Sequence, residues 1–259
     1  MTVLSEDRRL TTSDPTHWPA LLGPQLWALI ATLGSPPRTL QPIRRLASAV
    51  SARAAFRVGL ADGRVLKARR LESAERAEML VAIWPLITDL PFSRGLAQQG
   101  AAVLETWIEG DPVTAERVTS ARLEEAGDLL GRLHRLVLPT SLAGRLPLPA
   151  RLLRKVERHL GTLASRGLLS GQQTALLLDE ARRHLPQRLE SGLIHHDFCA
   201  ENLILTDQGR LWAIDNEDMR VGALDADLAR CFLRWPMSAY ARDAFLRGYG
   251  RHRSAERYQ

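Results

Sequence analysis

The sequence predicts an α+β protein in which a small antiparallel sheet comes first and a mostly helical part follows. Alternating apolar residues around a tight turn mark residues 40–70 as strands. Leucines at helical spacing dominate residues 111–190, and a helical pattern returns from residue 225. One short hairpin, 203–214, interrupts the helices. Strands grouped ahead of helices, with a single inserted hairpin, indicate the α+β class.

The first part of the chain contains one helix and a group of strands. Residues 19–34 read as a helix that ends at a glycine followed by a Pro-Pro pair. The segment 55–60 alternates apolar and polar residues, an Asp-Gly pair follows at 62–63, and 64–69 reads as the return strand. Residues 43–46 are a candidate third strand. Together these segments predict the small antiparallel sheet.

The middle of the chain changes from strand to helix. A helix over 72–87 has an apolar stripe, and the apolar run 101–107 reads as a strand. The segment 109–112, Glu-Gly-Asp-Pro, is a candidate hinge between lobes. We therefore expect an N-terminal lobe over residues 1–108 and a helical C-terminal lobe over residues 109–259. Three further helices are expected in that second lobe, over 123–138, 149–166 and 171–190.

Composition narrows the class of protein. The chain has 259 residues, 45% of them hydrophobic, and a formal net charge of +6. No segment has the length of a membrane span, and the N-terminus lacks an apolar signal region, so we expect a cytoplasmic protein without a membrane partner. The basic residues are spread along the chain and are not interleaved with aromatic residues, which argues against a nucleic-acid partner. Cys199 and Cys231 lack metal-ligand spacing and read as reduced, structural thiols.

Lysine and asparagine are rare in a chain rich in arginine. The lysines are Lys67 and Lys155, and the asparagines are Asn202 and Asn216. A lysine offers a compact point charge that arginine does not reproduce against a phosphate. Lys67 follows a glycine-containing hairpin and precedes a helix with two candidate glutamates, Glu75 and Glu78. This context makes Lys67 a candidate phosphate-binding residue.

The most informative segment carries a pattern suited to phosphoryl transfer. It contains His195-x-Asp197-x-x-x-x-Asn202, and the following hairpin delivers Asp215. Transfer to a hydroxyl needs an acceptor for the hydroxyl proton and oxygen ligands for the magnesium ions that bridge the phosphates. One loop can supply the first through Asp197 and a metal ligand through Asn202. The hairpin then returns the chain so that Asp215 reaches the metal.

These motifs resemble those of the aminoglycoside phosphotransferase and choline kinase family, relatives of protein kinases. In that family the loop reads His-Gly-Asp-x-x-x-x-Asn, and a later motif reads Ile-Asp-Trp or Ile-Asp-Phe. Here the corresponding segments are 195–202 and 214–216. Segments 130–134 and 225–229 resemble the family's Leu-x-x-Leu-His helix and its Asp-Leu-Ala segment. The resemblance spans about residues 43–250 and implies a protein-kinase-like, two-lobed fold.

The resemblance also implies a role for each matching residue. Asp197 would be the catalytic base, and Asn202 and Asp215 would bind Mg²⁺. Lys67 would hold the nucleotide phosphates, with Glu78 as its ion-pair partner. The donor would be ATP or GTP, and the acceptor a hydroxyl of a small molecule.

Two further residues receive structural roles from the resemblance. His195 would be structural, and Asp227 would support the catalytic loop from below. His134, on its leucine-rich helix, reads as a core histidine. Glu217 is equally consistent with a place near the metals and with a solvated acid.

Two departures from the family pattern stand out. The segment that should cover the nucleotide, 47–55, has no glycine, although Ser51 or Ser48 could still lie over the phosphates. His196 replaces the usual glycine of the loop and reads either as a plain loop residue or as part of the acceptor site.

Three functions follow from these features. The first is a small-molecule kinase that uses Mg²⁺ with ATP or GTP. Its acceptor could be an antibiotic, a sugar, an amino alcohol or a natural-product intermediate. The basic chain argues against a polycationic aminoglycoside, whereas the acidic residues Glu217, Asp218, Asp225 and Asp227 keep that acceptor open. The second is a nucleotide-binding pseudokinase or regulatory module, favoured by the glycine-free loop. The third is a kinase that acts on a macromolecule. The sequence leaves the acceptor, the choice of nucleotide and the oligomeric state open.

Overall fold

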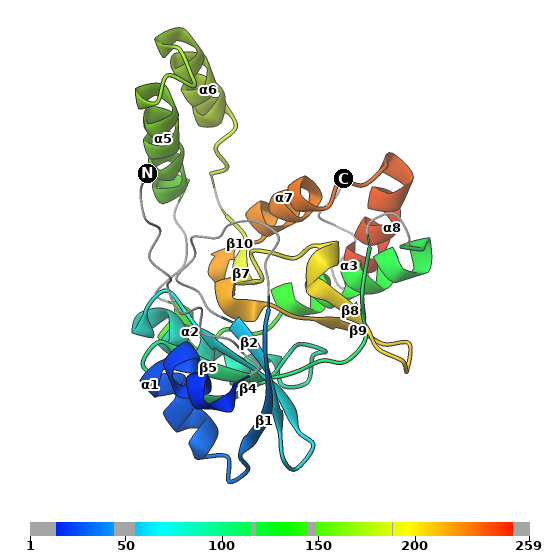
Figure 1. The fold of residues 1–259 in the computed structure, drawn as a ribbon. Coiled ribbons are helices and arrows are strands. Elements are labelled where there is room, and N and C mark those ends of the chain that lie inside the picture. Colours follow the sequence, from blue (N-terminus) through cyan, green and yellow to red (C-terminus); the bar gives the residue numbers. More distant parts are fainter. Residues whose placement is uncertain (1–13, 44–54, 115–117, 144–148, 188, 251–259) are drawn as a thin grey trace, which may run out of the picture. The chain divides into compact units, whose positions relative to one another are not determined.

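A computed structural model describes residues 14–43, 55–114, 118–143, 149–187 and 189–250. Its contacts divide the chain into two compact units (Figure 1). The first unit comprises residues 1–114 and 200–218, and the second comprises residues 115–199 and 219–259. The hairpin that carries Asp215 thus packs with the N-terminal sheet. The lobe boundary expected at residue 108 stays a prediction.

The first unit is built around a five-stranded antiparallel sheet of order β1-β2-β3-β5-β4. The strands are β1 (Pro37–Pro42), β2 (Ala55–Leu60), β3 (Val65–Arg70), β4 (Gly95–Gln99) and β5 (Ala102–Thr106). The sheet confirms the strands expected over 55–60, 64–69 and 101–107. The first described strand is β1, in which Leu40 and its neighbours pair with β2 in register. Residues 44–46 lie outside the described residues.

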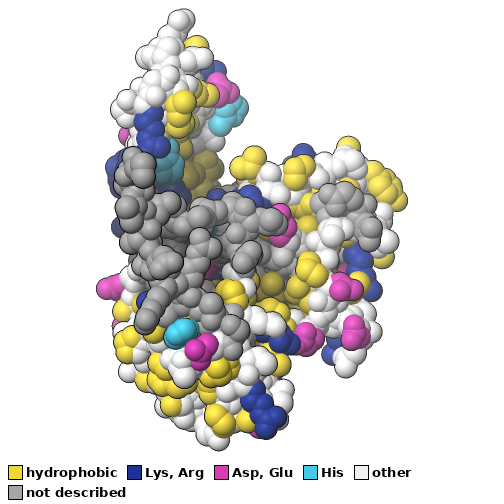
Figure 2. Space-filling view, viewed as in Figure 1, with side chains coloured by type: hydrophobic (Ala, Val, Ile, Leu, Met, Phe, Trp, Pro, Cys, Tyr) yellow, Lys and Arg dark blue, Asp and Glu magenta, His cyan; other side chains and the backbone are white. Residues whose placement is uncertain are grey.

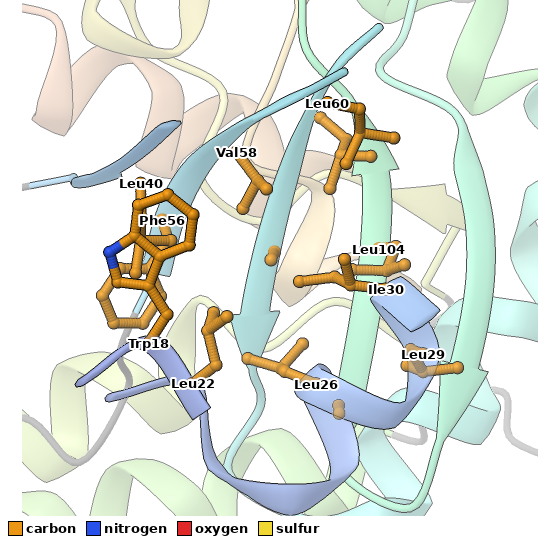
Figure 3. Close-up of a cluster of buried hydrophobic side chains, with 13 residues drawn as sticks. Trp18, Leu22, Leu26, Leu29, Ile30, Leu40, Phe56, Val58, Leu60 and Leu104 are labelled. Atoms are coloured by element: carbon orange, nitrogen blue, oxygen red, sulfur yellow. The ribbon is translucent and has the colours of Figure 1, made fainter. Parts of the chain in front are cut away.

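Helix α1 (Trp18–Ala31) packs on one face of this sheet, after a short turn η1 (Pro15–His17). It is kinked where Gly23 takes a positive φ of 74° just before Pro24. Figure 3 shows apolar side chains of α1 facing those of the strands. The buried cluster includes Trp18, Leu22, Leu26, Leu29, Ile30, Leu40, Phe56, Val58, Leu60, Leu66, Ala68, Ala102 and Leu104.

Helix α2 (Ala74–Ile83) continues into the 3₁₀ turn η2 (Trp84–Ile87). Ser73 caps it by accepting a hydrogen bond from the backbone N–H of Arg76. Ala77 and Leu80 pack with Val103 of β5. Val103 and Leu104 are adjacent, so they point to opposite faces of the sheet, toward α2 and α1 respectively.

A second, three-stranded sheet of order β6-β8-β9 completes the first unit. Its strands are β6 (Asp111–Pro112), β8 (Leu203–Leu205) and β9 (Leu211–Ala213), with the turns η3 (Ala200–Asn202) and η4 (Asn216–Asp218) at the ends of the hairpin. The β8–β9 hairpin confirms the one expected from the sequence. The short strand β6 lies within the segment read as a hinge.

The second unit is mostly helical, as expected. Its helices are α3 (Ser120–His134), α4 (Thr140–Ala143), α5 (Pro149–Ser165), α6 (Gly171–Arg183), α7 (Leu224–Arg234) and α8 (Ala239–Gly250). The antiparallel strands β7 (Ser191–Ile194) and β10 (Arg220–Ala223) lie beside α7. Both Cys199 and Cys231 are buried, which agrees with the structural role expected for them. In the described part of the chain, no helix combines the length and apolar character needed to cross a membrane.

Helices α3 and α8 make the closest helix contact of the second unit, side by side in Figure 1. Two glycines allow this approach. A Cβ added at Gly127 would lie 1.9 Å from the carbonyl oxygen of Phe245, and one added at Gly248 would lie 1.9 Å from that of Glu124. The backbones of the two helices therefore touch where side chains would otherwise separate them.

Gly127→Ala is expected to destabilise the protein by about 1–3 kcal/mol, because the added methyl group has no space and forces the two backbones apart. Alanine is otherwise the better helix former, by about 1 kcal/mol. Urea denaturation followed by circular dichroism measures the change in the free energy of unfolding.

Gly161→Ala on α5 is the matched control, because nothing lies within 4 Å of the added Cβ. It should leave stability unchanged or raise it. Equal effects of the two substitutions would contradict the tight packing of α3 on α8.

Candidate active site

The candidate residues belong to both units, and each group lies within its own unit. In the first unit, β3 alternates between two environments. Leu66 and Ala68 belong to the core beneath α1. Lys67 and Arg69, one position along, share the opposite face because side chains alternate along a strand. The strand thus carries an apolar face and a cationic face.

Lys67 and Arg69 of β3 both contact Asp215, the residue expected to bind metal. Lys67 Nζ lies 3.1 Å from Asp215 Oδ1, and Arg69 Nη1 lies 2.6 Å from the same oxygen. Asp215 directly follows Ile214 at the end of the hairpin and has a positive φ of 66°. Aspartate tolerates this left-handed conformation better than most residues. The bend turns the carboxylate toward β3.

Arg69 is the centre of a buried ionic network. Its Nε lies 2.9 Å from Glu105 Oε2, and its Nη1 lies 2.9 Å from Glu217 Oε2. The side chain of Arg69 is 2% exposed and that of Glu105 is 0% exposed. Burial alone would lower the pKa of Arg69, but Glu105, Asp215 and Glu217 raise it above its ordinary value. The guanidinium stays charged and holds β5 and the segment after β9 against β3.

Asn202 and Asp215 are brought close by the register of the β8–β9 hairpin. Leu203 pairs with Ala213, and the backbone N–H of Ile214 donates to the carbonyl oxygen of Asn202 at 2.9 Å. Both side chains are half-buried. A carboxylate and an amide oxygen on adjacent positions suit Mg²⁺, which usually takes its remaining ligands from water and phosphates. The two residues therefore fit a magnesium ion whose remaining ligands would come from water and phosphate oxygens. Among the described residues, no group of three His, Cys, Asp or Glu forms a metal site on its own.

The predicted ion pair between Lys67 and Glu78 is wrong in this structure. Glu78 is exposed on α2, as is Glu75, and the ion pair of Lys67 among the described residues is with Asp215. On β5, Glu105 is the register partner of Lys67, and it pairs with Arg69. The strand places a buried carboxylate on this face, where the sequence favoured one on the helix. Ser51, expected over the phosphates, lies outside the described residues.

In the second unit, Asp227 lies beneath the loop that carries the catalytic motif. Its Oδ2 accepts a hydrogen bond from the backbone N–H of His195 at 2.9 Å, and its Oδ1 accepts one from that of His196 at 2.7 Å. His134 Nε2 lies 3.0 Å from Oδ2, and its Nδ1 lies 2.8 Å from the hydroxyl of Tyr249. This geometry supports the structural role proposed for Asp227. His134 is a satisfied core histidine.

The environment of Asp227 favours its charged form. Burial would raise the pKa of this carboxyl, but the hydrogen bond and charge of His134, with further contributions from His195, hold it below the ordinary value of 3.8. His195 is itself fully buried and lies edge-on to Phe198, with ring centroids 5.6 Å apart. The loop is thus held by hydrogen bonds to the Asp227 carboxylate and by the packing of His195 against the ring of Phe198.

His196 has a positive φ of 67° at the position where the family pattern has glycine. A side chain in this conformation costs about 1–2 kcal/mol relative to glycine. The structure offsets part of this cost, because Arg220 Nη2 contacts His196 Nε2 and the backbone N–H bonds to Asp227. His196 therefore links the loop to β10.

Asp197, the expected catalytic base, lies beside two arginines of α7. Its Oδ1 is 3.2 Å from Arg234 Nη1 and 3.6 Å from Arg230 Nη2. The side chain of Asp197 is 16% exposed, so solvent reaches it. Arg230 and Arg234 are four residues apart and lie on one face of the helix.

Sequence reasoning missed several residues of these networks. They are Arg69, Glu105, Arg220, Arg230 and Arg234, and Glu217 was left open between two readings. Two spacings carried a signal: Arg69 lies two residues after Lys67 on a strand, and Arg230 and Arg234 are one helical turn apart. Glu217 is buried and bonded to Arg69, so the reading as a solvated acid is wrong.

Arg69→Met should destabilise the protein by about 3–5 kcal/mol, since it leaves the buried carboxylates of Glu105 and Glu217 without their cation. The measurement is the denaturation midpoint in urea at pH 7. Arg64→Met is the control, because Arg64 pairs with Asp62 at an exposed turn and its loss should leave the denaturation midpoint nearly unchanged. A cost for Arg69→Met no larger than that of the control would contradict the network.

Asp227→Asn should lower stability at neutral pH by about 1.5–3 kcal/mol, because it removes the charged acceptor of these hydrogen bonds. The pKa of Asp227 is lowered in the folded state, so its contribution is present above the ordinary value of 3.8 and is lost as the pH falls through the folded pKa. Unfolding free energies from about pH 7 to about pH 2 should therefore fall less steeply in the variant on the acid side. Asp207→Asn, at an exposed turn, should leave the wild-type profile. Parallel acid limbs in wild type and Asp227→Asn would contradict the assignment.

Solved structures with the same fold include an ADP-bound aminoglycoside phosphotransferase, with 17% identity and a TM-score of 0.66 over 89% of this chain and 83% of that one. An ethanolamine kinase from Plasmodium vivax gives 15% identity and a TM-score of 0.64 over 84% of this chain and 68% of that one. A choline kinase from Streptococcus pneumoniae gives 15% identity and a TM-score of 0.65 over 86% and 78%. These similarities confirm the kinase-like α+β fold expected from the sequence.

The comparison with protein families is more specific. No curated protein matches the sequence. The model of a family described as a phosphotransferase enzyme family matches residues 42–258. This span includes Lys67, Asp197, Asn202, Asp215 and Asp227, and it confirms the expected enzyme class. Because the match covers most of the sequence, the chain belongs to the phosphotransferase enzyme family.

Proposed function

We propose that the protein is a magnesium-dependent kinase that transfers the γ-phosphate of ATP or GTP to a hydroxyl of a small molecule. The observation that carries the proposal is the 3.1 Å contact between Lys67 and Asp215 within a chain of this family. A phosphate-binding cation and a metal-binding carboxylate need to be close if both are to serve the same phosphates. An ADP-bound neighbour of the same fold supports an adenine nucleotide.

The first unit would hold the nucleotide. Lys67 would neutralise charge on its phosphates, and Asn202 and Asp215 would hold Mg²⁺. Mg²⁺ held by these two residues would supply the positive charge that stabilises the negative charge developing on the phosphates. Arg69 would keep the Asp215 carboxylate in place, since it binds the same oxygen as Lys67. This arrangement concentrates catalysis in positioning and charge neutralisation.

Asp197 would orient the acceptor and take its proton. The hydroxyl oxygen attacks the γ-phosphorus, the bond from that phosphorus to the bridging oxygen breaks, and the nucleoside diphosphate leaves. The hydroxyl proton passes to Asp197. The partly exposed position of Asp197 supports this role, because an acceptor can reach it. The contacts of Asp227 to the backbone of His195 and His196 keep the start of the loop in place.

Asp197→Ala should reduce slow magnesium-dependent hydrolysis of ATP or GTP by about 10²-fold or more, as expected when a positioned proton acceptor is removed. Phosphate release by the purified chain measures this with each nucleotide in turn. Asp207→Ala removes an exposed carboxylate from the hairpin turn and should retain wild-type hydrolysis.

Nucleotide binding without hydrolysis by wild type, and without transfer to any acceptor, would instead indicate a pseudokinase. Phosphate transfer to a protein or RNA would indicate a macromolecular acceptor. If the chain neither binds nor hydrolyses ATP or GTP, the proposal is overturned.

A further inference from the structure

One acidic side chain of the main sheet is buried, although acidic side chains otherwise lie largely at the surface. Figure 2 shows them scattered over the visible face. In the described part of the chain the buried ones are Glu105, Glu217 and Asp227, and Glu105 is 0% exposed. A glutamate is seldom fully buried unless it is paired with a cation. The contacts of Glu105 therefore indicate what this residue does.

Glu105 pairs with Arg69 on the neighbouring strand. Lys67 and Glu105 lie opposite each other in the register of β3 and β5, and Arg69 shares the face of Lys67 because side chains alternate along a strand. Arg69 Nε lies 2.9 Å from Glu105 Oε2. Neither carboxylate oxygen of Glu105 has a hydrogen-bond partner among the described residues. Glu105 therefore acts on Arg69 through its negative charge and not through a directed hydrogen bond.

The same guanidinium contacts the carboxylate that is expected to bind Mg²⁺. Arg69 Nη1 lies 2.6 Å from Asp215 Oδ1 and 2.9 Å from Glu217 Oε2. An arginine paired with a single carboxylate neutralises it and competes with a metal ion for it. Here one positive charge is divided among three carboxylates. Glu105 and Glu217 therefore limit how strongly Arg69 binds Asp215.

Lys67 contacts the same oxygen of Asp215 but is less enclosed than Arg69. Its Nζ lies 3.1 Å from Asp215 Oδ1, and its side chain is 13% exposed against 2% for Arg69. Under the proposed function Lys67 turns to the nucleotide phosphates, whereas Arg69 stays buried beside Asp215. The groups that restrain Arg69 then decide how this carboxylate is presented to the metal.

Of the two restraining carboxylates, Glu105 is anchored outside the hairpin segment. Glu217 lies two residues after Asp215, so it moves with the residue that it would position. Glu105 is on β5, which pairs with β3 along the strand. We propose that Glu105 is a positioning residue of the magnesium site, which acts through Arg69 to hold Asp215 and to keep its charge available to the metal. This role rests on the proposed function, and it assigns to a strand residue what the family pattern assigned to Glu78 on α2.

Matched substitutions at Glu105 and Glu78 test the proposal, because each removes one negative charge and keeps the size of the side chain. Isothermal titration of ADP into the full chain, at a series of Mg²⁺ concentrations, gives the Mg²⁺ concentration for half-maximal ADP binding. Glu105→Gln should raise this concentration about tenfold, because Arg69 then binds Asp215 more tightly. Glu78→Gln should leave it unchanged, since Glu78 is exposed on α2.

The Kd of ADP in EDTA separates positioning from a general loss of structure. Glu105→Gln should not raise this metal-free Kd, since it removes a negative charge from the face that carries Lys67. Glu105→Asp is the conservative variant, which keeps the charge but moves it away from Arg69. It should raise the Mg²⁺ requirement by only about threefold. It also tests the role if Glu105→Gln does not fold, as circular dichroism would show.

Several results would overturn the role of Glu105. They are an unchanged Mg²⁺ requirement in Glu105→Gln, equal rises in the two glutamine variants, and a larger rise in Glu78→Gln. A metal-free Kd that rises in Glu105→Gln by the same factor as the Mg²⁺ requirement would show that Glu105 only stabilises the sheet, and would overturn it too. Wild type that binds no ADP at any Mg²⁺ concentration would overturn the proposed function as well, whereas the other results leave that function standing.

Discussion

The first unit depends on one buried cation. Arg69 contacts Glu105 of β5, Asp215 after β9 and Glu217 of η4, so a single guanidinium joins the main sheet to the hairpin segment. Removing the cation or its carboxylates leaves an unpaired charge in a site that water does not reach, so the network is stable only when both are present. The orientation of Asp215 follows from it. A carboxylate held by a structural ion pair is already positioned before any ligand arrives.

Much of this fold is readable in the sequence because the signals are local. The Asp-Gly turn at 62–63, the alternation in β2 and the leucine spacing in α3 each depend on residues within one element. The motif of Asp197, Asn202 and Asp215 is readable for a similar reason, since one hairpin connects its parts. The family match across residues 42–258 confirms the family and the enzyme class that this motif led us to expect.

The features of the fold and of the candidate site that the sequence did not predict depend on contacts between distant segments. Whether Glu105 or Glu78 is buried depends on packing between distant segments, which the local sequence does not encode. Glu105 of β5 is buried on the face of the sheet that carries Lys67 and Arg69, whereas Glu78 of α2 is exposed. Strands β4, β6 and β10 lack strong alternation and form because partners lie beside them. The cations at Asp197 come from β10 and α7, more than twenty residues away in the chain. Linear spacing could show that Arg230 and Arg234 share a helical face, but not what that face contacts.

The scarcity of lysine gives the molecule a built-in pair of reporters. Its two lysine amines belong to Lys67, in the ion pair with Asp215, and to Lys155 on α5. Reductive ¹³C-methylation would therefore add two side-chain signals to an NMR spectrum, one from each compact unit. Each amine would report on the unit that contains it, so the effect of a ligand on the two units could be followed separately in one sample. A protein with an ordinary number of lysines would hide both signals among many others.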